Sequence, residues 1–330
     1  MIVSASYRTD IPAFYGAWFL ERLHAGWVRT ASPYGGKPAH LPLTRETVDG
    51  FVFWTRNAGP FLPALEAVGA VPFPFVVQYT ITGYPKPLDA ATPDPRRGCD
   101  WLQRLASRYG AAAAVWRYDP IVFTSLTPPA WHAGTFHSLA RSLRGAVDEV
   151  VVSFAQIYRK TARNMNAAAR AFGFHWWDPP SDQKRALLTD LAAIAAECGL
   201  AITLCGQREL LVPGVGDARC IDAERLSRVA GRPIGALRRP HRKTCGCWAS
   251  RDIGDYDSCI QGCAYCYAVN GRAAAKDRLE RHDPAGPSLI PPRSTPAPAC
   301  VEGALPRPPD QNFSSSWTPD ASPRGSPCRS

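Results

Sequence analysis

Short apolar runs alternate with longer stretches of helical periodicity along the first 282 residues of the chain. The runs are five to seven residues long and mostly apolar, and they do not alternate between apolar and polar positions. That pattern is typical of parallel strands buried on both faces. It predicts six strands, at Met1–Ser6, Phe51–Thr55, Phe75–Ile81, Ala112–Arg117, Glu149–Phe154 and Leu200–Cys205.

Helical periodicity fills the intervals between these runs and continues after the last one. In the first interval Phe14, Trp18, Phe19 and Leu23 recur at helical spacing, and Asp10 is placed to cap the helix. The pattern predicts seven helices, at Pro12–Leu23, Pro60–Val68, Cys99–Arg108, Pro129–Leu143, Thr161–Phe172, Ser181–Cys198 and Asp222–Val229.

Strands that alternate with helices imply a parallel sheet covered by helices. The six β/α units predict the α/β class and, as first choice, a closed or partly closed parallel β/α barrel; an open doubly wound sheet is the alternative. We expect residues 1–235 to form the barrel domain and the cysteine-rich residues 236–282 to close it. Residues 283–330 hold twelve of the 32 prolines, so we expect this tail to be disordered.

The charge of the chain is +10, and the excess of positive charge lies upstream of the tail. Between Arg228 and Lys243 there are six Lys or Arg residues and no acid. Such a run favours an anionic partner such as nucleic acid. A solvated loop, or stabilisation of a nearby anionic cluster, are the alternatives. No apolar run approaches the roughly 20 residues that span a bilayer, and the N-terminus reads as a strand, so we expect a cytoplasmic protein with no membrane contact.

Polar residues follow the predicted strands, where parallel β/α barrels gather their chemistry. The candidate site residues are Arg8, Asp10, Arg56, Asn57, Arg117 and Asp119. We expect them to line one pocket. The alternatives are structural: Asp10 caps a helix, Asp119 shapes a turn before Pro120, and the arginines pair with these carboxylates.

The chain has eleven cysteines, and five of them fall between positions 245 and 266. In a reducing compartment, clustered cysteines indicate metal or redox chemistry. Cys259, Cys263 and Cys266 form a C-x3-C-x2-C motif, which predicts three thiolate ligands of a 4Fe–4S cluster with its fourth iron open. Zinc, held by Cys245 and Cys247 together with Cys263 and Cys266, is the alternative.

Four thiols outside this motif suggest a second metal site, an auxiliary cluster held by Cys205, Cys220, Cys245 and Cys247. Cys205 and Cys220 are otherwise small core residues. A third interpretation gives Cys245 or Cys247 to the main cluster as its fourth ligand, which would close the open iron and indicate an electron carrier or sensor.

The C-x3-C-x2-C motif with Tyr265 resembles the radical S-adenosylmethionine (SAM) superfamily. This resemblance implies a 4Fe–4S cluster whose open iron binds SAM, adenine packed on Tyr265, and a flavodoxin or ferredoxin as electron donor. In the superfamily the motif usually follows the first barrel strand, whereas here it follows the last.

The stretch from Cys245 to Ala268 and the strand-end motifs, including Trp54-Thr55-Arg56-Asn57, resemble a bacterial domain family of unknown function with a C-terminal cysteine cluster. Shorter pieces resemble spore photoproduct lyase, a radical SAM enzyme. We therefore expect a radical SAM-like enzyme acting on an unidentified substrate. The alternative is a nucleic-acid-associated protein whose cluster, or zinc, is structural or sensing.

Overall fold

An eight-stranded parallel sheet forms the centre of the molecule in the computed structural model, which describes residues 1–30, 38–70, 73–242 and 244–291. The strand order is β11-β10-β8-β6-β5-β4-β1-β12. The strands are β1 (Ile2–Ala5), β4 (Gly50–Thr55), β5 (Phe75–Thr80), β6 (Ala114–Ile121), β8 (Glu149–Phe154), β10 (Ala201–Leu204), β11 (Val215–Asp217) and β12 (Ser250–Asp252). All six predicted strands are therefore present.

Two short antiparallel pairs stand outside the main sheet. They are β2 (Trp27–Thr30) with β3 (Ala39–Pro42), and β7 (Phe123–Thr124) with β9 (Trp176–Trp177). The helices are α1 (Ile11–Phe14), α2 (Gly16–Ala25), α3 (Leu62–Ala70), α4 (Pro95–Tyr109), α5 (Pro129–Leu143), α6 (Arg159–Phe172), α7 (Ser181–Glu197), α8 (Ala223–Ala230) and α9 (Arg272–Glu280). Single 3₁₀ turns lie at Gly59–Phe61, Ala111–Ala113 and Arg208–Leu210. None of the helices in the described ranges is long and apolar enough to cross a membrane.

The predicted helices are present with small shifts at their ends. The prediction of one helix over Pro12–Leu23 was wrong in one respect, because the segment divides into α1 and α2 at Tyr15. The Asp10 carboxylate accepts a hydrogen bond from the Ala13 backbone N–H, as an N-cap does.

The two faces of the sheet are covered by different parts of the chain. One face packs against α1–α5 and α7 through side chains such as Phe53 and Trp116. The other face, through Val52 and Val115, packs on α8 and on the chain around Trp248. Because this segment fills the face that a barrel would enclose, β11 and β12 remain edge strands with no pairing to each other among the described residues. The α/β parallel sheet is confirmed, whereas the described strands do not close into a barrel.

The predicted cysteine-rich segment is part of the sheet, because β12 pairs in parallel with β1. The tail predicted to begin at residue 283 also needs correction at its start. Leu289 and Ile290 are buried in the main core, and Trp18 Nε1 donates to the Gly286 carbonyl over 3.0 Å. Apolar contacts thus hold residues 283–291, and the rest of the predicted tail lies outside the described residues.

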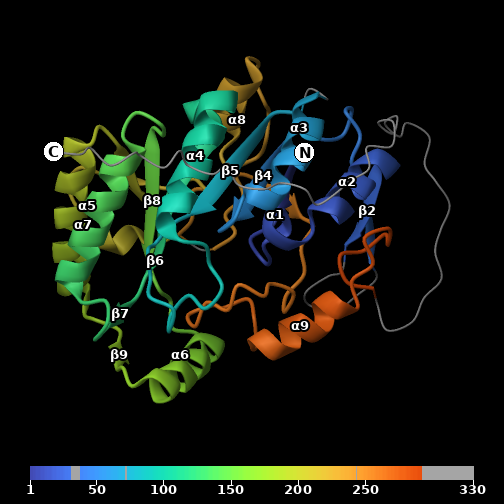
Figure 1. Cartoon of the computed structure of the whole chain (residues 1–330). Coiled ribbons are helices and arrows are strands. Elements are labelled where there is room, and N and C mark those ends of the chain that lie inside the picture. Colours follow the sequence, from blue (N-terminus) through green and yellow to red (C-terminus); the bar gives the residue numbers. More distant parts are fainter. Residues whose placement is uncertain (31–37, 71–72, 243, 292–330) are drawn as a thin grey trace, which may run out of the picture.

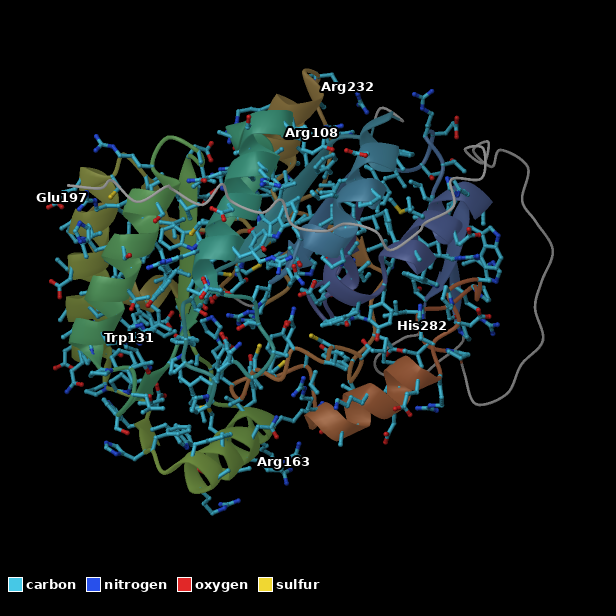
Figure 2. All side chains as sticks on the ribbon, viewed as in Figure 1. Arg108, Trp131, Arg163, Glu197, Arg232 and His282 are labelled. Carbon is cyan, nitrogen blue, oxygen red and sulfur yellow. The ribbon has the colours of Figure 1, made fainter. Side chains whose placement is uncertain are left out.

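The segment after β12 crosses one end of the sheet, together with α6 and α9 (Figure 1). Figure 2 places Arg163 of α6 and His282, just after α9, at this same end. Asn164 of α6 donates to the Val269 carbonyl over 3.1 Å, so α6 is tied to the segment directly. The carboxyl end of the sheet is therefore covered by the part of the chain that carries Cys259, Cys263 and Cys266.

Candidate functional site

The cysteine loop, residues 259–266, is held against the sheet by hydrogen bonds from several elements. Gln261 Nε2 donates to the buried Asp10 carboxylate over 2.9 Å. The Ala264 backbone N–H donates to the Leu88 carbonyl over 2.8 Å. The Tyr265 hydroxyl donates to Asp89 Oδ1 over 2.7 Å. The position of the loop is therefore set by residues that lie far from it in the sequence.

Arg56, which directly follows β4, connects this network to a cysteine. Its Nη2 lies 2.6 Å from both Asp89 Oδ2 and Thr82 Oγ1, and its Nη1 donates to Cys263 Sγ over 3.5 Å and also contacts the Tyr265 hydroxyl. Burial alone would lower the pKa of Arg56, but Asp89, Tyr265 and Cys263 together outweigh it and hold that pKa well above its usual range. Arg56 is therefore a permanent cation beside the cysteine loop.

The three cysteine sulfurs lie within electrostatic reach of one another. Burial is the main reason that the pKa of each thiol is raised, and the neighbouring thiols Cys259 and Cys266 add to the rise at Cys263. Arg56 opposes the rise at Cys263 and Cys266. The free thiols are neutral near pH 7, and a bound cationic metal centre would be needed to hold them as thiolates.

Cys259, Cys263 and Cys266 offer thiol sulfurs, the donors by which proteins hold iron–sulfur clusters. In the described part of the chain, no three His, Cys, Asp or Glu side chains converge closely enough to hold one metal ion. The Ala268 backbone N–H points at Cys266 Sγ over 3.4 Å, and N–H donors to sulfur stabilise cluster thiolates. Cys259, Cys263 and Cys266 are all partly exposed, so the loop is accessible from outside.

Tyr265 is engaged in holding the loop. It is buried, its ring packs edge-on against Tyr84 with 5.5 Å between centroids, and its hydroxyl bonds Asp89. Burial raises the pKa of the Tyr265 hydroxyl well above its usual range. One side of the Tyr265 ring is therefore covered by Tyr84.

Asp10 and Asn57 are satisfied by nearby backbone. Besides capping α1, Asp10 accepts a hydrogen bond from the Arg56 backbone N–H over 2.9 Å, and burial raises its pKa. Asn57 Oδ1 accepts from the Gly59 N–H over 3.3 Å at the start of the 3₁₀ turn. Both side chains therefore fix the backbone around Arg56.

Arg8 follows β1 and pairs with Asp252 at the end of β12, with 3.6 Å between Nε and Oδ1. The buried Asp252 carboxylate also accepts hydrogen bonds from Ser4 Oγ, over 2.9 Å, and from Ser6 Oγ, over 2.7 Å. Gly254 lies so close to Ser6 that an added Cβ would come within 2.0 Å of its Oγ. The segment leading to the cysteine loop is thereby joined to β1.

A second polar group gathers around Arg117 on β6. Its Nη2 lies 2.6 Å from Asp119 Oδ2, and its Nη1 donates to Gln78 Oε1 over 3.2 Å and to Cys220 Sγ over 3.0 Å. The guanidinium also lies over the Trp54 ring, 4.9 Å from its centroid. Arg117 therefore contacts both Asp119 and Cys220, whereas Arg56 contacts Cys263 of the cysteine loop.

The four remaining clustered cysteines are contiguous. Cys205 Sγ lies 3.3 Å from Cys220 Sγ. Cys247 interacts with both Cys220 and Cys245, and through these contacts the pKa of Cys245 falls to about 5. The sulfurs form a row, Cys205, Cys220, Cys247 and Cys245, which runs from β10 across the filled face of the sheet.

Aromatic rings occupy the space between the two cysteine groups. The Tyr267 hydroxyl donates to the Tyr7 carbonyl over 2.7 Å, and the Tyr7 ring lies 6.4 Å from the Trp54 ring. Arg8 lies over the Tyr7 and Tyr256 rings, 5.5 and 5.6 Å from their centroids. We refer to Tyr7, Trp54, Tyr256 and Tyr267 as the aromatic bridge. All four residues are half-buried, so each leaves part of its surface open to solvent.

The Arg228–Lys243 run is partly neutralised. Arg228 lies 3.7 Å from Asp148, and Arg238 lies 3.5 Å from Glu224 and over the Trp248 ring at 4.2 Å. Residue 243 lies outside the described residues. Arg228 and Arg238 therefore share their charge with acids and an aromatic ring of the same molecule.

Sequence reasoning missed Asp89, Asp252 and Gln261. Asp89 lies in a polar loop rich in proline and glycine, where an acidic residue shows no periodic pattern. Asp252 and Gln261 become visible as site residues only when β12 is known to pair with β1. A small cavity of about 20 Å³ beside Arg56 and Asp89 has room for little more than one water.

One family model matches most of the chain. The model of a domain of unknown function, DUF1848, matches residues 2–268. The chain belongs to the DUF1848 family. The match covers the whole sheet and ends just past the cysteine loop, so the DUF1848 domain includes both cysteine groups. None of the curated proteins and none of the solved structures compared with this DUF1848 chain matches it.

Proposed function

We propose that this DUF1848 protein binds a 4Fe–4S cluster through Cys259, Cys263 and Cys266 and is a radical SAM-like enzyme. The observation that carries the proposal is the placement of three partly exposed cysteines on one loop, at the carboxyl end of a parallel sheet, beside the permanent cation Arg56. Cys259, Cys263 and Cys266 would hold the cluster, which would supply one-electron chemistry toward bound SAM.

The residues of the chain contribute position and electrostatics. Arg56 donates to Cys263 Sγ and so favours its thiolate form. The pairs Asp10–Gln261 and Asp89–Tyr265 hold the loop at both of its ends. In this proposal Tyr265 positions the loop.

The aromatic bridge provides the surface on which SAM and substrate would lie. Its half-buried rings exclude water from beside the cluster, which protects reactive species. Arg8 lies over one side of the bridge and would orient an anionic group such as the carboxylate of SAM, whereas the buried Arg117 lies against Trp54 and fixes Asp119. Asp119 shares Arg117 and is the carboxylate placed to bind a cationic or hydroxyl group of a substrate.

Electron paramagnetic resonance (EPR) tests this proposal. The protein would be purified without oxygen, reconstituted with iron and sulfide, reduced, and measured with and without SAM. A cubane signal that changes on addition of SAM is expected, because SAM would bind the open iron. A cluster signal indifferent to SAM would remove the enzymatic part of the proposal and favour the sensor; zinc without iron would remove the cluster as well.

A further inference from the structure

Cys205 and Cys220 lie at the ends of neighbouring strands and face each other. Cys205 directly follows β10, and its backbone N–H still donates to the Val152 carbonyl over 2.8 Å. Cys220 follows β11, which pairs in parallel with β10. The two sulfurs are 3.3 Å apart, so they need to approach by only about 1.3 Å to reach the roughly 2.05 Å of a disulfide bond.

The surroundings of Cys220 favour its thiolate form. Arg117 Nη1 donates to Cys220 Sγ over 3.0 Å, and the Arg117 side chain is buried. Either sulfur of the pair can be the donor, and the contacts of Cys220 with Cys205, Cys247 and Arg117 together lower its pKa. The hydrogen bond from Arg117 reaches Cys220, so this buried sulfur is the nucleophile and the partly exposed Cys205 holds the proton.

The four-cysteine row is poorly arranged for a single metal ion, because no three of the described His, Cys, Asp or Glu side chains converge on one point. A dithiol reaction needs only two sulfurs in contact, and Cys205 with Cys220 meets that requirement. Neither residue belongs to the cysteine loop, so the pair has a chemistry separate from the proposed cluster.

We propose that Cys205 and Cys220 form a redox-active dithiol that closes to a disulfide when it meets a peroxide. The Cys220 thiolate attacks one peroxide oxygen, the O–O bond breaks, and the hydroxide that leaves takes up a proton to become water. The resulting sulfenic acid is attacked by the Cys205 sulfur, which loses its proton as the S–S bond forms and a second water leaves. Two thiols are oxidised and one peroxide is reduced to two waters.

The reaction alters the charge at the aromatic bridge. Before it, Arg117 faces two negative groups, Asp119 and the Cys220 thiolate. Afterwards Cys220 is neutral and Arg117 keeps one anionic partner. The oxidised form therefore carries one more positive charge in the buried polar group beneath Trp54.

Peptide mapping of the full-length protein tests the proposal. The protein would be purified without oxygen, its iron and zinc content measured, and then exposed to one equivalent of hydrogen peroxide before alkylation. Trypsin cleaves after Arg208 and Arg219, so the two cysteines fall on different peptides. A peptide pair linked through Cys205 and Cys220 is expected.

Cys198 lies on the same tryptic peptide as Cys205 and is buried, which makes Cys198→Ala the matched control. The linked pair should persist in Cys198→Ala and vanish in Cys205→Ser and Cys220→Ser. In Cys205→Ser, a dimedone-type reagent should trap a sulfenic acid on Cys220. Arg117→Met should slow the oxidation about tenfold, the equivalent of one pKa unit in the thiolate population.

Three results would overturn the proposal. One is wild-type protein with native circular dichroism and no linked pair. Another is an Arg117→Met variant that reacts at the wild-type rate. The third is stoichiometric zinc or iron that is lost in both Cys205→Ser and Cys220→Ser, because these sulfurs would then be metal ligands. The mapping does not depend on the Cys259 motif, so loss of the proposed cluster leaves it unaffected.

Discussion

The Arg56 guanidinium and the Asp89 carboxylate form a buried ion pair 2.6 Å long, directly behind the cysteine loop. Asp89 is 1% exposed and also accepts a hydrogen bond from the Tyr265 hydroxyl, so one carboxylate holds both the cation and the loop. Removing one partner of such a pair leaves an uncompensated charge in a region with little water.

Asp89→Ala is expected to lower the free energy of unfolding by about 3 kcal/mol, because Arg56 would stay buried without its counter-charge. Urea denaturation followed by circular dichroism measures this. Glu66→Ala is the matched control, since the Arg108–Glu66 pair lies with both side chains more than half exposed and should contribute less than about 1 kcal/mol. Equal losses in the two variants would contradict the role given to Asp89.

Cys263→Ala is expected to prevent assembly of the proposed cluster, because one of only three protein ligands is lost. Iron and sulfide content after anaerobic reconstitution, with the EPR signal, measures the effect. Cys99→Ala serves as control, since Cys99 is buried in the core on α4. A full-occupancy cluster in Cys263→Ala protein would sink the ligand assignment.

Gly254→Ala is expected to cost about 1–3 kcal/mol of stability, because the new Cβ would lie 2.0 Å from Ser6 Oγ. Gly134 offers a control of opposite sign. It lies in α5 with nothing within 4 Å of an added Cβ, so Gly134→Ala should stabilise by roughly 0.5–1 kcal/mol. Thermal and urea unfolding of both variants would decide. A harmless Gly254→Ala would mean that Ser6 and Gly254 are not in close contact.

His132 predicts a dependence of stability on pH. It is buried between the Tyr118 hydroxyl and the Val122 carbonyl, at 2.9 and 3.0 Å, and burial lowers its pKa to about 4. Between pH 6.5 and 4 the unfolded chain binds a proton at this residue that the folded protein does not. The contribution of neutral His132 to the free energy of unfolding is therefore complete above pH 6.5. It is lost as the pH falls toward 4, by up to about 3 kcal/mol.

Urea unfolding of wild type and His132→Gln at pH 7 and pH 4.5 isolates this contribution, because the other titrating groups are common to both proteins. The wild type should lose more stability on acidification than the variant does. Identical losses would show that His132 binds its proton equally well in the folded and unfolded chain.

The central strands could be predicted from sequence because burial on both faces makes them apolar throughout. Both predicted ends of β8 are correct, because Glu149–Phe154 is a run of that kind. β12 could not be predicted in this way, because Ser250-Arg-Asp is short and polar and becomes a strand only by pairing with β1. The role of Asp252 could not be predicted for the same reason. Its hydrogen-bond partners, Ser4 and Ser6, lie nearly the whole domain away in sequence.

The grouping of the four cysteines Cys205, Cys220, Cys245 and Cys247 was predictable, because Cys205 ends a predicted strand on the side toward which the later cysteines return. The ion pairs beneath the loop were not. Asp89 has no spacing relative to Arg56 that sequence reasoning could recognise, because the two residues meet only after the loop between β5 and α4 has folded back.

β1 lies between β4 and β12, so its two neighbours come from opposite parts of the chain. During synthesis on the ribosome the β4 partner emerges early, whereas the β12 partner emerges about 250 residues after β1. Until then the outer edge of β1 has no strand to bond, and contacts across such a long loop form slowly. The N-terminal strand is completed only when residues 250–252, close to the end of the domain, have been made, and a nascent chain that stalls before residue 250 would expose that edge to aggregation.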